Sequence, residues 1–346
     1  MPMRFRRKYG VMLPAVLTAG LVASGCTTTT PYAAKVGSQV ISVAALNREA
    51  SDLASNSAFV STISQSVQVK GSGTNTYTTS FMDTVLGRRI ALVLIQQALN
   101  KLRIGLSTSS PIAILTAEQS YGGPQAFAAF SKSYQHQLIT DTADITALEA
   151  YLTRTNISIP ALQSFYSAHP EQFTQICSYH ILSSTLSASQ KIYAQLQAGA
   201  NFAQLAKSQS ADSASAQAGG YLGCGTYAQY QNAFGTAFAN TVASAPLNKP
   251  QPPVAEKSGY GVAMAGSRSL IPFQQAIPSV VATLFGSAGS TAVGSFVSGL
   301  AKAANIRVNP AYGSYKISGT TAQVVVSVIQ PAQAIGSRMP ICSRGG

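Results

Sequence analysis

The stretch CSYHIL, residues 177–182, holds a histidine inside an apolar run, and the whole chain has only three histidines. If the stretch is a strand, Ser178, His180 and Leu182 point to one face, whereas Cys177 points to the other. His180 then either packs in a core, as a single histidine in a strand often does, or faces a site. Both alternatives stay open at this point.

Metal chemistry is not indicated. His136 and His169 match no motif, and we expect both on the surface. Three scattered histidines and four cysteines, without the spacing of Cys/His ligand sets, predict no metal site.

The elements that would position His180 follow from the patterns around it. ICSYHILSS alternates and predicts a strand. SASQKIYAQLQAGA predicts a helix that begins at Ser187 and ends at Gly199. NFAQLAKSQS predicts a second helix, GGYLGC a turn into a strand, and SGYGVAMAGS a terminal strand. Together these pieces predict an α+β unit of the size of one small domain.

Helices dominate the sequence before this unit. FMDTVLGRRIALVLIQQALNKLRIGLS is apolar nearly all round, which predicts a buried central helix, with Asp83 as its cap. A short strand and a helix from Ser42 precede it. Further helices are predicted over 115–137 and 142–154 and in SIPALQSFYSAHPEQFT. A helix around 280–304 follows the unit, and the uncharged stretch that contains it is broken by Pro and Gly, which favours a soluble segment.

The N-terminus has the pattern of an export signal. MRFRRKYG is cationic, VMLPAVLTAGLVA is apolar but too short for a stable membrane span, and small residues precede Cys26. The small-small-Cys ending resembles a bacterial lipobox, which implies that Cys26 carries lipid. The alternative is an ordinary secretory signal with an incidental cysteine. The TTTTPYAA that follows looks like a polar tether and favours the lipoprotein.

The composition is basic and poor in charge, with 23 Lys and Arg against 10 Asp and Glu. Four of the basic residues lie in the leader, so the formal charge falls from +13 to 13 − 4 = +9 without them. The others are scattered, which favours attraction to an anionic surface such as a membrane. We expect no nucleic-acid binding, since there is no basic patch or known motif.

The order of pieces from YHILSS through GGYLG resembles the parvulin type of peptidyl-prolyl isomerase. It includes the L-x-x-G-A-x-F turn, the Ser-x-Asp loop and a later Ser-Gly-Tyr strand. VGSQVIS, ALQSFYSAHPEQF and IRVNPAYG resemble the helical lobe of SurA/PrsA-type foldases. The resemblance implies rotation about X–Pro bonds. That rotation is slow but breaks no bond, so no cofactor is expected.

The resemblance also implies site residues. His180 matches the family's first site histidine, Asp212 a loop position that is Cys or Asp, and Ser258 a polar position on the last strand. We expect these three to be catalytic. The residues expected in the proline pocket are Leu222, Phe234 and Phe238. The alternative for Asp212 is a plain turn residue, and the alternative for the two phenylalanines, which their residue type favours, is the core.

Two positions depart from the family pattern. The second family histidine should follow SGY, where this chain has Gly261. The threonine often found two residues before Ser258 is Glu256 here. Both departures favour an alternative in which the domain is degenerate and the chain is a non-catalytic holdase chaperone.

The same resemblance places the strand of His180 beside the strand after Gly-Gly-x-Leu-Gly, which implies a disulfide between Cys177 and Cys224. Export would place both cysteines in a compartment that permits disulfides. Two buried free thiols are the alternative, and Cys342 has no partner in view.

We therefore expect an α+β protein, a helical SurA/PrsA-like lobe with an inserted parvulin-like domain. It would be an extracytoplasmic foldase, lipid-anchored to the outer face of the cell membrane, that acts on newly exported, unfolded chains containing X–Pro bonds. The expected divisions are a signal peptide (1–25), a lipidated tether (26–34), a helical lobe (35–172), a parvulin-like domain (173–268), a segment that completes the lobe (269–315) and a tail (316–346).

Overall fold

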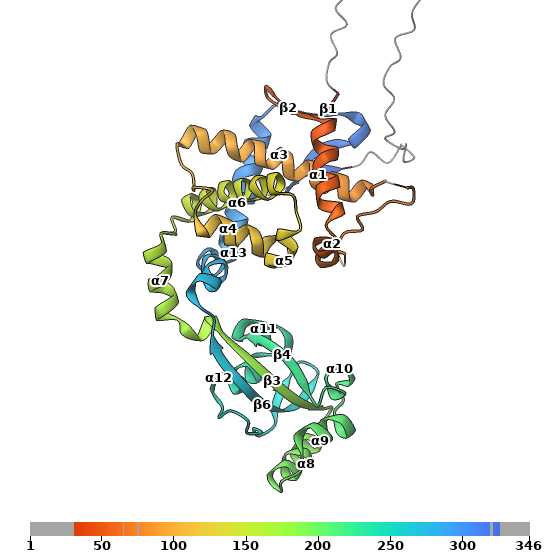
Figure 1. The fold of residues 1–346 in the computed structure, drawn as a ribbon, viewed down its shortest axis with the longest axis vertical. Coiled ribbons are helices and arrows are strands. Elements are labelled where there is room, and N and C mark those ends of the chain that lie inside the picture. Colours follow the sequence, from red (N-terminus) through yellow and green to blue (C-terminus); the bar gives the residue numbers. More distant parts are fainter. Residues whose placement is uncertain (1–30, 65, 75, 319–320, 326–346) are drawn as a thin grey trace, which may run out of the picture.

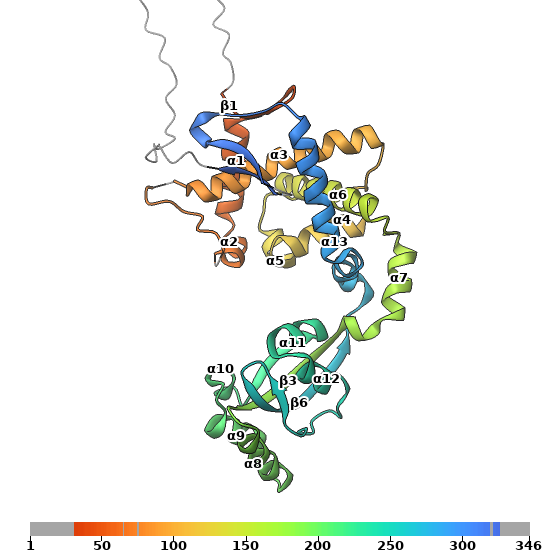
Figure 2. The same cartoon turned by 180° about the vertical axis from the view of Figure 1, so that it is seen from behind.

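The computed structural model describes residues 31–64, 66–74, 76–318 and 321–325. Figure 1 shows two parts, a helical lobe and a smaller part built on a sheet. Two connections join them, α7 (Ile159–Ala168) on the way out and α13 (Phe273–Ala303) on the way back, and Figure 2 shows both from behind. The predicted α+β class, with a small antiparallel sheet inside a mostly helical chain, is confirmed.

The lobe is built from both ends of the described chain. Before the smaller part come β1 (Tyr32–Val36), β2 (Gln39–Ser42), α1 (Val43–Ser55), α2 (Ser57–Ile63), α3 (Thr79–Leu102), α4 (Pro111–Ser120), α5 (Gly123–Ala128) and α6 (Lys132–Thr153); after it come β7 (Ile306–Val308), η2 (Pro310–Tyr312), β8 (Ser314–Ser318) and β9 (Thr321–Val325). β1 lies between β2 and β7 in an antiparallel sheet. The part between α7 and α13 is therefore an insertion into the lobe.

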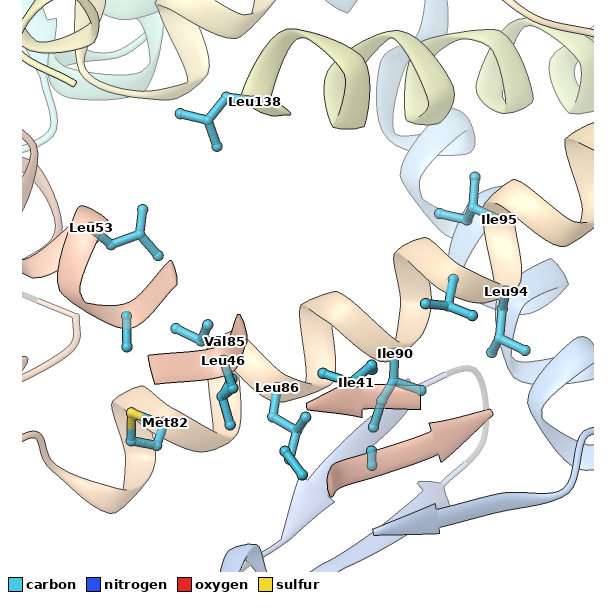
Figure 3. Close-up of a cluster of buried hydrophobic side chains, with 14 of the residues drawn as sticks. Ile41, Leu46, Leu53, Met82, Val85, Leu86, Ile90, Leu94, Ile95 and Leu138 are labelled. Atoms are coloured by element: carbon cyan, nitrogen blue, oxygen red, sulfur yellow. The ribbon is translucent and has the colours of Figure 1, made fainter. Parts of the chain in front are cut away.

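The core of the lobe forms around α3. Leu86, Ile90 and Leu94 are buried on this helix and pack with side chains from β2, α1 and α6 (Figure 3). Burying one such side chain contributes about 1.5–3 kcal/mol. The expectation of a buried central helix is confirmed, because buried residues lie on nearly all its sides.

A charged cluster lies beside this core and joins three helices. Arg88 of α3 contacts Glu49 of α1 and Asp141 of α6, each at 2.9 Å, and Arg89 contacts Glu49 at 2.7 Å. The two carboxylates are almost fully buried, at 5% and 2% exposed. Removing one partner of such a buried pair is costly, because the remaining charge has no compensation.

The predicted cap of α3 is wrong. The helix begins at Thr79, and the Thr78 hydroxyl accepts the Phe81 N–H, so Thr78 is the cap. Asp83 lies inside the helix, where burial raises its pKa to about 6. A capping side chain accepts from the N–H two or three residues later, and four helical residues already precede Asp83.

The helices predicted over 115–137 and 142–154 have other bounds. The chain forms α4, α5 and α6 instead, and Gly122, at φ 91°, separates the first two. The Ser131 hydroxyl accepts the Tyr134 N–H and starts α6 ten residues before the predicted position of 142. Short polar caps thus decide these boundaries, whereas the apolar periodicity continues across them.

The helix predicted around 280–304 begins earlier, at Phe273, and Gly286 interrupts it with φ 56° and ψ −159°. By length and composition α13 is the one helix of the described residues that could cross a membrane. In this structure it packs against α4, α6 and α7. Within the segment predicted as a tail, β8 and β9 pair as an antiparallel hairpin up to Val325, and residues 326–346 lie outside the described part of the chain.

Candidate functional site

The inserted part is a four-stranded antiparallel sheet in the order β4-β3-β6-β5. Its elements after η1 (Pro170–Phe173) are β3 (Thr174–Ser183), α8 (Leu186–Gln197), α9 (Phe202–Gln209), α10 (Ser213–Ala216), β4 (Tyr221–Thr226), α11 (Tyr227–Phe234), α12 (Thr236–Ser244), β5 (Val254–Glu256) and β6 (Gly259–Leu270). The predicted strand around His180 and the two predicted helices after it are all present, although α8 is capped by Thr185 and not by Ser187.

β3 is a central strand, covered on both faces. Ile181 packs on one face against α8 and α9. Ile176 packs on the other face with residues of α11 and α12, and the His180 ring meets Phe234 and Phe238 of the same two helices. The alternation of the strand thus places Ile181 and His180 on opposite faces, and His180 faces α11 and α12.

His180 is buried between two carboxylates. Its Nε2 lies 2.9 Å from Asp212 Oδ2, and its Nδ1 lies 3.0 Å and 3.2 Å from the two oxygens of Glu256. The side chains of His180 and Glu256 are each 2% exposed, whereas that of Asp212 is 24% exposed. Asp212 is therefore the member of the trio that is most open to solvent.

Local structure fixes Asp212 in this position. It caps α10, where its carboxylate accepts the Ala214 N–H at 3.1 Å and the Ser215 hydroxyl at 2.5 Å. The preceding loop is held against β3, because the Ala211 N–H donates to the Leu182 carbonyl at 2.8 Å. Asp212 is thus a turn residue and a neighbour of His180 at once, so the two sequence-based alternatives are compatible.

The charges in the trio shift two pKa values. Burial alone lowers the pKa of His180, but the hydrogen bonds and charges of Glu256 and Asp212 raise it above the ordinary value. Burial raises the pKa of Asp212, but the hydrogen bonds from Ser215, His180 and Ala214 outweigh burial and hold it below the ordinary value. The two carboxylates thus favour the charged form of the His180 ring, and the hydrogen bonds to Asp212 favour its ionised form.

Aromatic side chains form one wall beside the trio. Phe234 and Phe238 stack edge-on to the His180 ring, with centroids 5.4 Å and 6.2 Å away. Phe238 is fully buried and belongs to the core, whereas Phe234 and Leu222 are partly buried at its border. Tyr230, which sequence reasoning missed, donates its hydroxyl to the carbonyls of Ile176 and Gly223 and so joins β3 to β4.

Ser258 does not join the trio. It lies exposed in the turn between β5 and β6, and no hydrogen bond of the described residues links it to His180. The structure places Glu256, and not Ser258, beside Nδ1 of His180. Only the departure from the family threonine marked Glu256 in the sequence, and nothing there indicated that its carboxylate would turn inward.

Cys177 and Cys224 face each other on β3 and β4 and form a disulfide. The bond joins the strand of His180 to the strand that follows the glycine pair. Gly220 of that pair has a φ of 85°, and its carbonyl accepts the His180 N–H at 2.9 Å. A Cβ at Gly220 would overlap the His180 carbonyl, so only glycine permits this approach.

Comparison with known families assigns the inserted part. Residues 183–266 match the PPIC-type PPIASE domain. The matched range contains Asp212, Glu256 and Gly261, and it begins just after His180. The resemblance of this region to parvulin-type isomerases is thus confirmed, and the chain carries a peptidyl-prolyl cis-trans isomerase domain. No curated protein matches the chain.

Solved structures of foldases and chaperones resemble the chain weakly. PrsA from Bacillus anthracis is 20% identical, with a TM-score of 0.31, over 65% of this chain and 99% of that one. PrsA from Streptococcus pneumoniae is 13% identical, with a TM-score of 0.37, over 79% and 93%. A SurA-like chaperone from Campylobacter jejuni is 17% identical, with a TM-score of 0.27, over 81% and 100%.

Proposed function

We propose that this chain, which carries a PPIC-type peptidyl-prolyl isomerase domain, is an extracytoplasmic foldase that isomerises X–Pro bonds in unfolded clients. The observation that carries the proposal is the trio of Asp212, His180 and Glu256 inside that domain. Burying a histidine with a carboxylate at each ring nitrogen costs free energy of folding. Such buried ionisable clusters are concentrated at functional sites.

The chemistry suits rotation about an amide. Planar amide resonance places negative charge on the carbonyl oxygen, and twisting the C–N bond removes part of that charge. With both carboxylates ionised and the imidazole charged, the trio would have a net charge of about −1. Such a site disfavours the planar amide with its charged oxygen more than the twisted one, and this difference lowers the barrier.

We assign the partly exposed Asp212 to the contact with the peptide and His180 to its support. Phe234 and Leu222, partly buried at the border of the aromatic core, would contact the proline ring. Fully buried Phe238 supports that wall from behind. Ser258 is not part of the proposed site, because its side chain lies in an exposed turn.

The helical lobe would hold the unfolded client near this domain. We take the lobe as residues 35–172 together with 269–325, since β8 and β9 extend it beyond the expected limit of 315. Residues 173–268 are then the isomerase unit. The proposed lipid anchor at Cys26 rests on the sequence pattern alone, because residues 1–30 lie outside the described part of the chain.

Two assays on the chain from Thr27 onward test the proposal. One follows cis-trans exchange of a short X–Pro peptide, and the other follows aggregation of an unfolded client. We expect faster exchange and suppressed aggregation. Suppressed aggregation without faster exchange would overturn the isomerase assignment and favour the holdase, the alternative that the Gly261 and Glu256 departures support. Mass spectrometry of the exported protein tests the anchor, since a diacylated N-terminal Cys26 is expected.

A further inference from the structure

Gly261 leaves a space in the sheet that another side chain fills. Gly261 lies on β6 opposite Val254 of β5, and its φ is not positive, so its backbone does not require glycine. A Cβ built at this position would overlap the carboxylate of Glu256. Any larger residue at 261 therefore requires Glu256 to leave its place.

The Glu256 carboxylate that fills this space also contacts the His180 ring. Glu256 comes from the end of β5, its side chain is 2% exposed, and it reaches Nδ1 of His180 with both oxygens. An ionised carboxylate only accepts hydrogen bonds, and one lies at each ring nitrogen, an arrangement that a ring with a proton on both nitrogens satisfies. The charged groups that face His180 are Glu256 from β5 and Asp212 from the cap of α10, while α11 and α12 present phenylalanine rings.

We propose that Glu256 is a positioning residue that replaces the side chain absent at Gly261 and holds His180 doubly protonated behind Asp212. The inference rests on the proposed function, because it explains how an isomerase site that departs from the family pattern at two positions remains organised. The two departures from the family pattern, glycine at 261 and glutamate at 256, then depend on each other. Asp212 is the end of the trio that meets the peptide, and Glu256 acts on it through His180.

The first test is a titration of the histidine rings by NMR in the chain from Thr27 onward, which has three histidines to assign. We expect His180 to remain charged above the ordinary pKa of about 6.5. Glu256→Gln keeps the shape but removes the charge, so it should lower the pKa of His180 by about one pH unit or more. X–Pro turnover should fall about tenfold or more.

Glu171→Gln is the matched control. Glu171 lies 3.6 Å from His169 in an exposed pair, with the two side chains 64% and 41% exposed. Because solvent screens this pair, the control should leave both X–Pro turnover and the pKa of His180 unaltered.

A substitution cycle tests the coupling independently of how Glu256→Gln folds. Gly261→His alone should lower the melting temperature and turnover, because the new side chain overlaps Glu256. Adding Glu256→Thr should recover both, so the two changes are strongly non-additive. The proposal is overturned if Glu256→Gln leaves the pKa of His180 unchanged, or if the double variant is no better than Gly261→His. Absence of turnover in the unaltered chain would overturn the proposed function instead, and the titration would still decide the role of Glu256.

Discussion

Removing the disulfide between Cys177 and Cys224 is predicted to destabilise the isomerase domain strongly. The two cysteines are 47 residues apart in sequence. In the chain-entropy model, closing a loop of that size removes about 14 cal/mol/K from the unfolded chain, which is about 4 kcal/mol at 25 °C. Since a small domain has a total stability of 5–15 kcal/mol, Cys177→Ser with Cys224→Ser should lower the melting temperature of this domain by about 15–30 °C.

Far-UV circular dichroism during urea or thermal unfolding measures this loss, and it suits a chain without tryptophan. Cys342→Ser is the control, because it removes a thiol without opening the Cys177–Cys224 loop. It should leave the urea midpoint and the melting temperature unaltered. The oxidised chain from Thr27 onward should contain one free thiol. Three free thiols, or a double variant whose unfolding free energy falls by less than about 1 kcal/mol, would refute the reasoning.

Three further outcomes follow from the buried charges. Asp141→Asn should destabilise the lobe by about 3–5 kcal/mol, since it leaves the Arg88 and Arg89 guanidiniums with one buried carboxylate; if urea unfolding shows a loss as small as that of Asp144→Asn, the cluster is not a buried network. The raised pKa of Asp83, about 6, means that ionising this side chain destabilises the folded lobe. This loss of folding free energy grows from pH 4 to 6 and remains at pH 7. Asp83→Asn should therefore stabilise the lobe at pH 7 by about 1–2 kcal/mol, because partial exposure screens the full effect, and should not do so at pH 4; equal effects at both would contradict this. For the trio, the raised pKa of His180 predicts a stabilisation of the isomerase domain that is lost as the pH rises through the His180 pKa. The lowered pKa of Asp212 predicts a stabilisation that is lost as the pH falls through the Asp212 pKa. A melting temperature of the isomerase domain that rises from pH 7 to 9 would be inconsistent with a charged His180.

The elements around His180 could be predicted because local patterns determine them. A few adjacent residues are enough to predict the alternation of β3, the two helices α8 and α9, and the Gly219–Gly220 turn, although the cap of α8 lies at Thr185 and not at the predicted Ser187. Helix boundaries in the lobe were harder, because the Thr78 cap of α3 lies five residues before the charged Asp83 that attracts attention in the sequence.

The organisation of the site could not be predicted from local patterns. Glu256 and His180 are 76 residues apart, and only the pairing of β3 with β6 and of β6 with β5 brings them together. In the sequence Gly261 and Glu256 look like two independent losses. In the structure the carboxylate of Glu256 occupies the space beside Gly261 where a larger side chain would lie. Such compensation depends on packing in three dimensions and not on local sequence.

X–Pro exchange by the chain from Thr27 onward, measured beside His180→Ala and the exposed-histidine control His169→Ala, tests the central claim most directly. We predict that the unaltered chain and His169→Ala accelerate exchange equally, and that His180→Ala loses about 100-fold or more of that acceleration, in line with a positioned ionisable group. Equal activity in all three proteins, or none in any, would contradict the account that the buried trio of Asp212, His180 and Glu256 forms a working isomerase site.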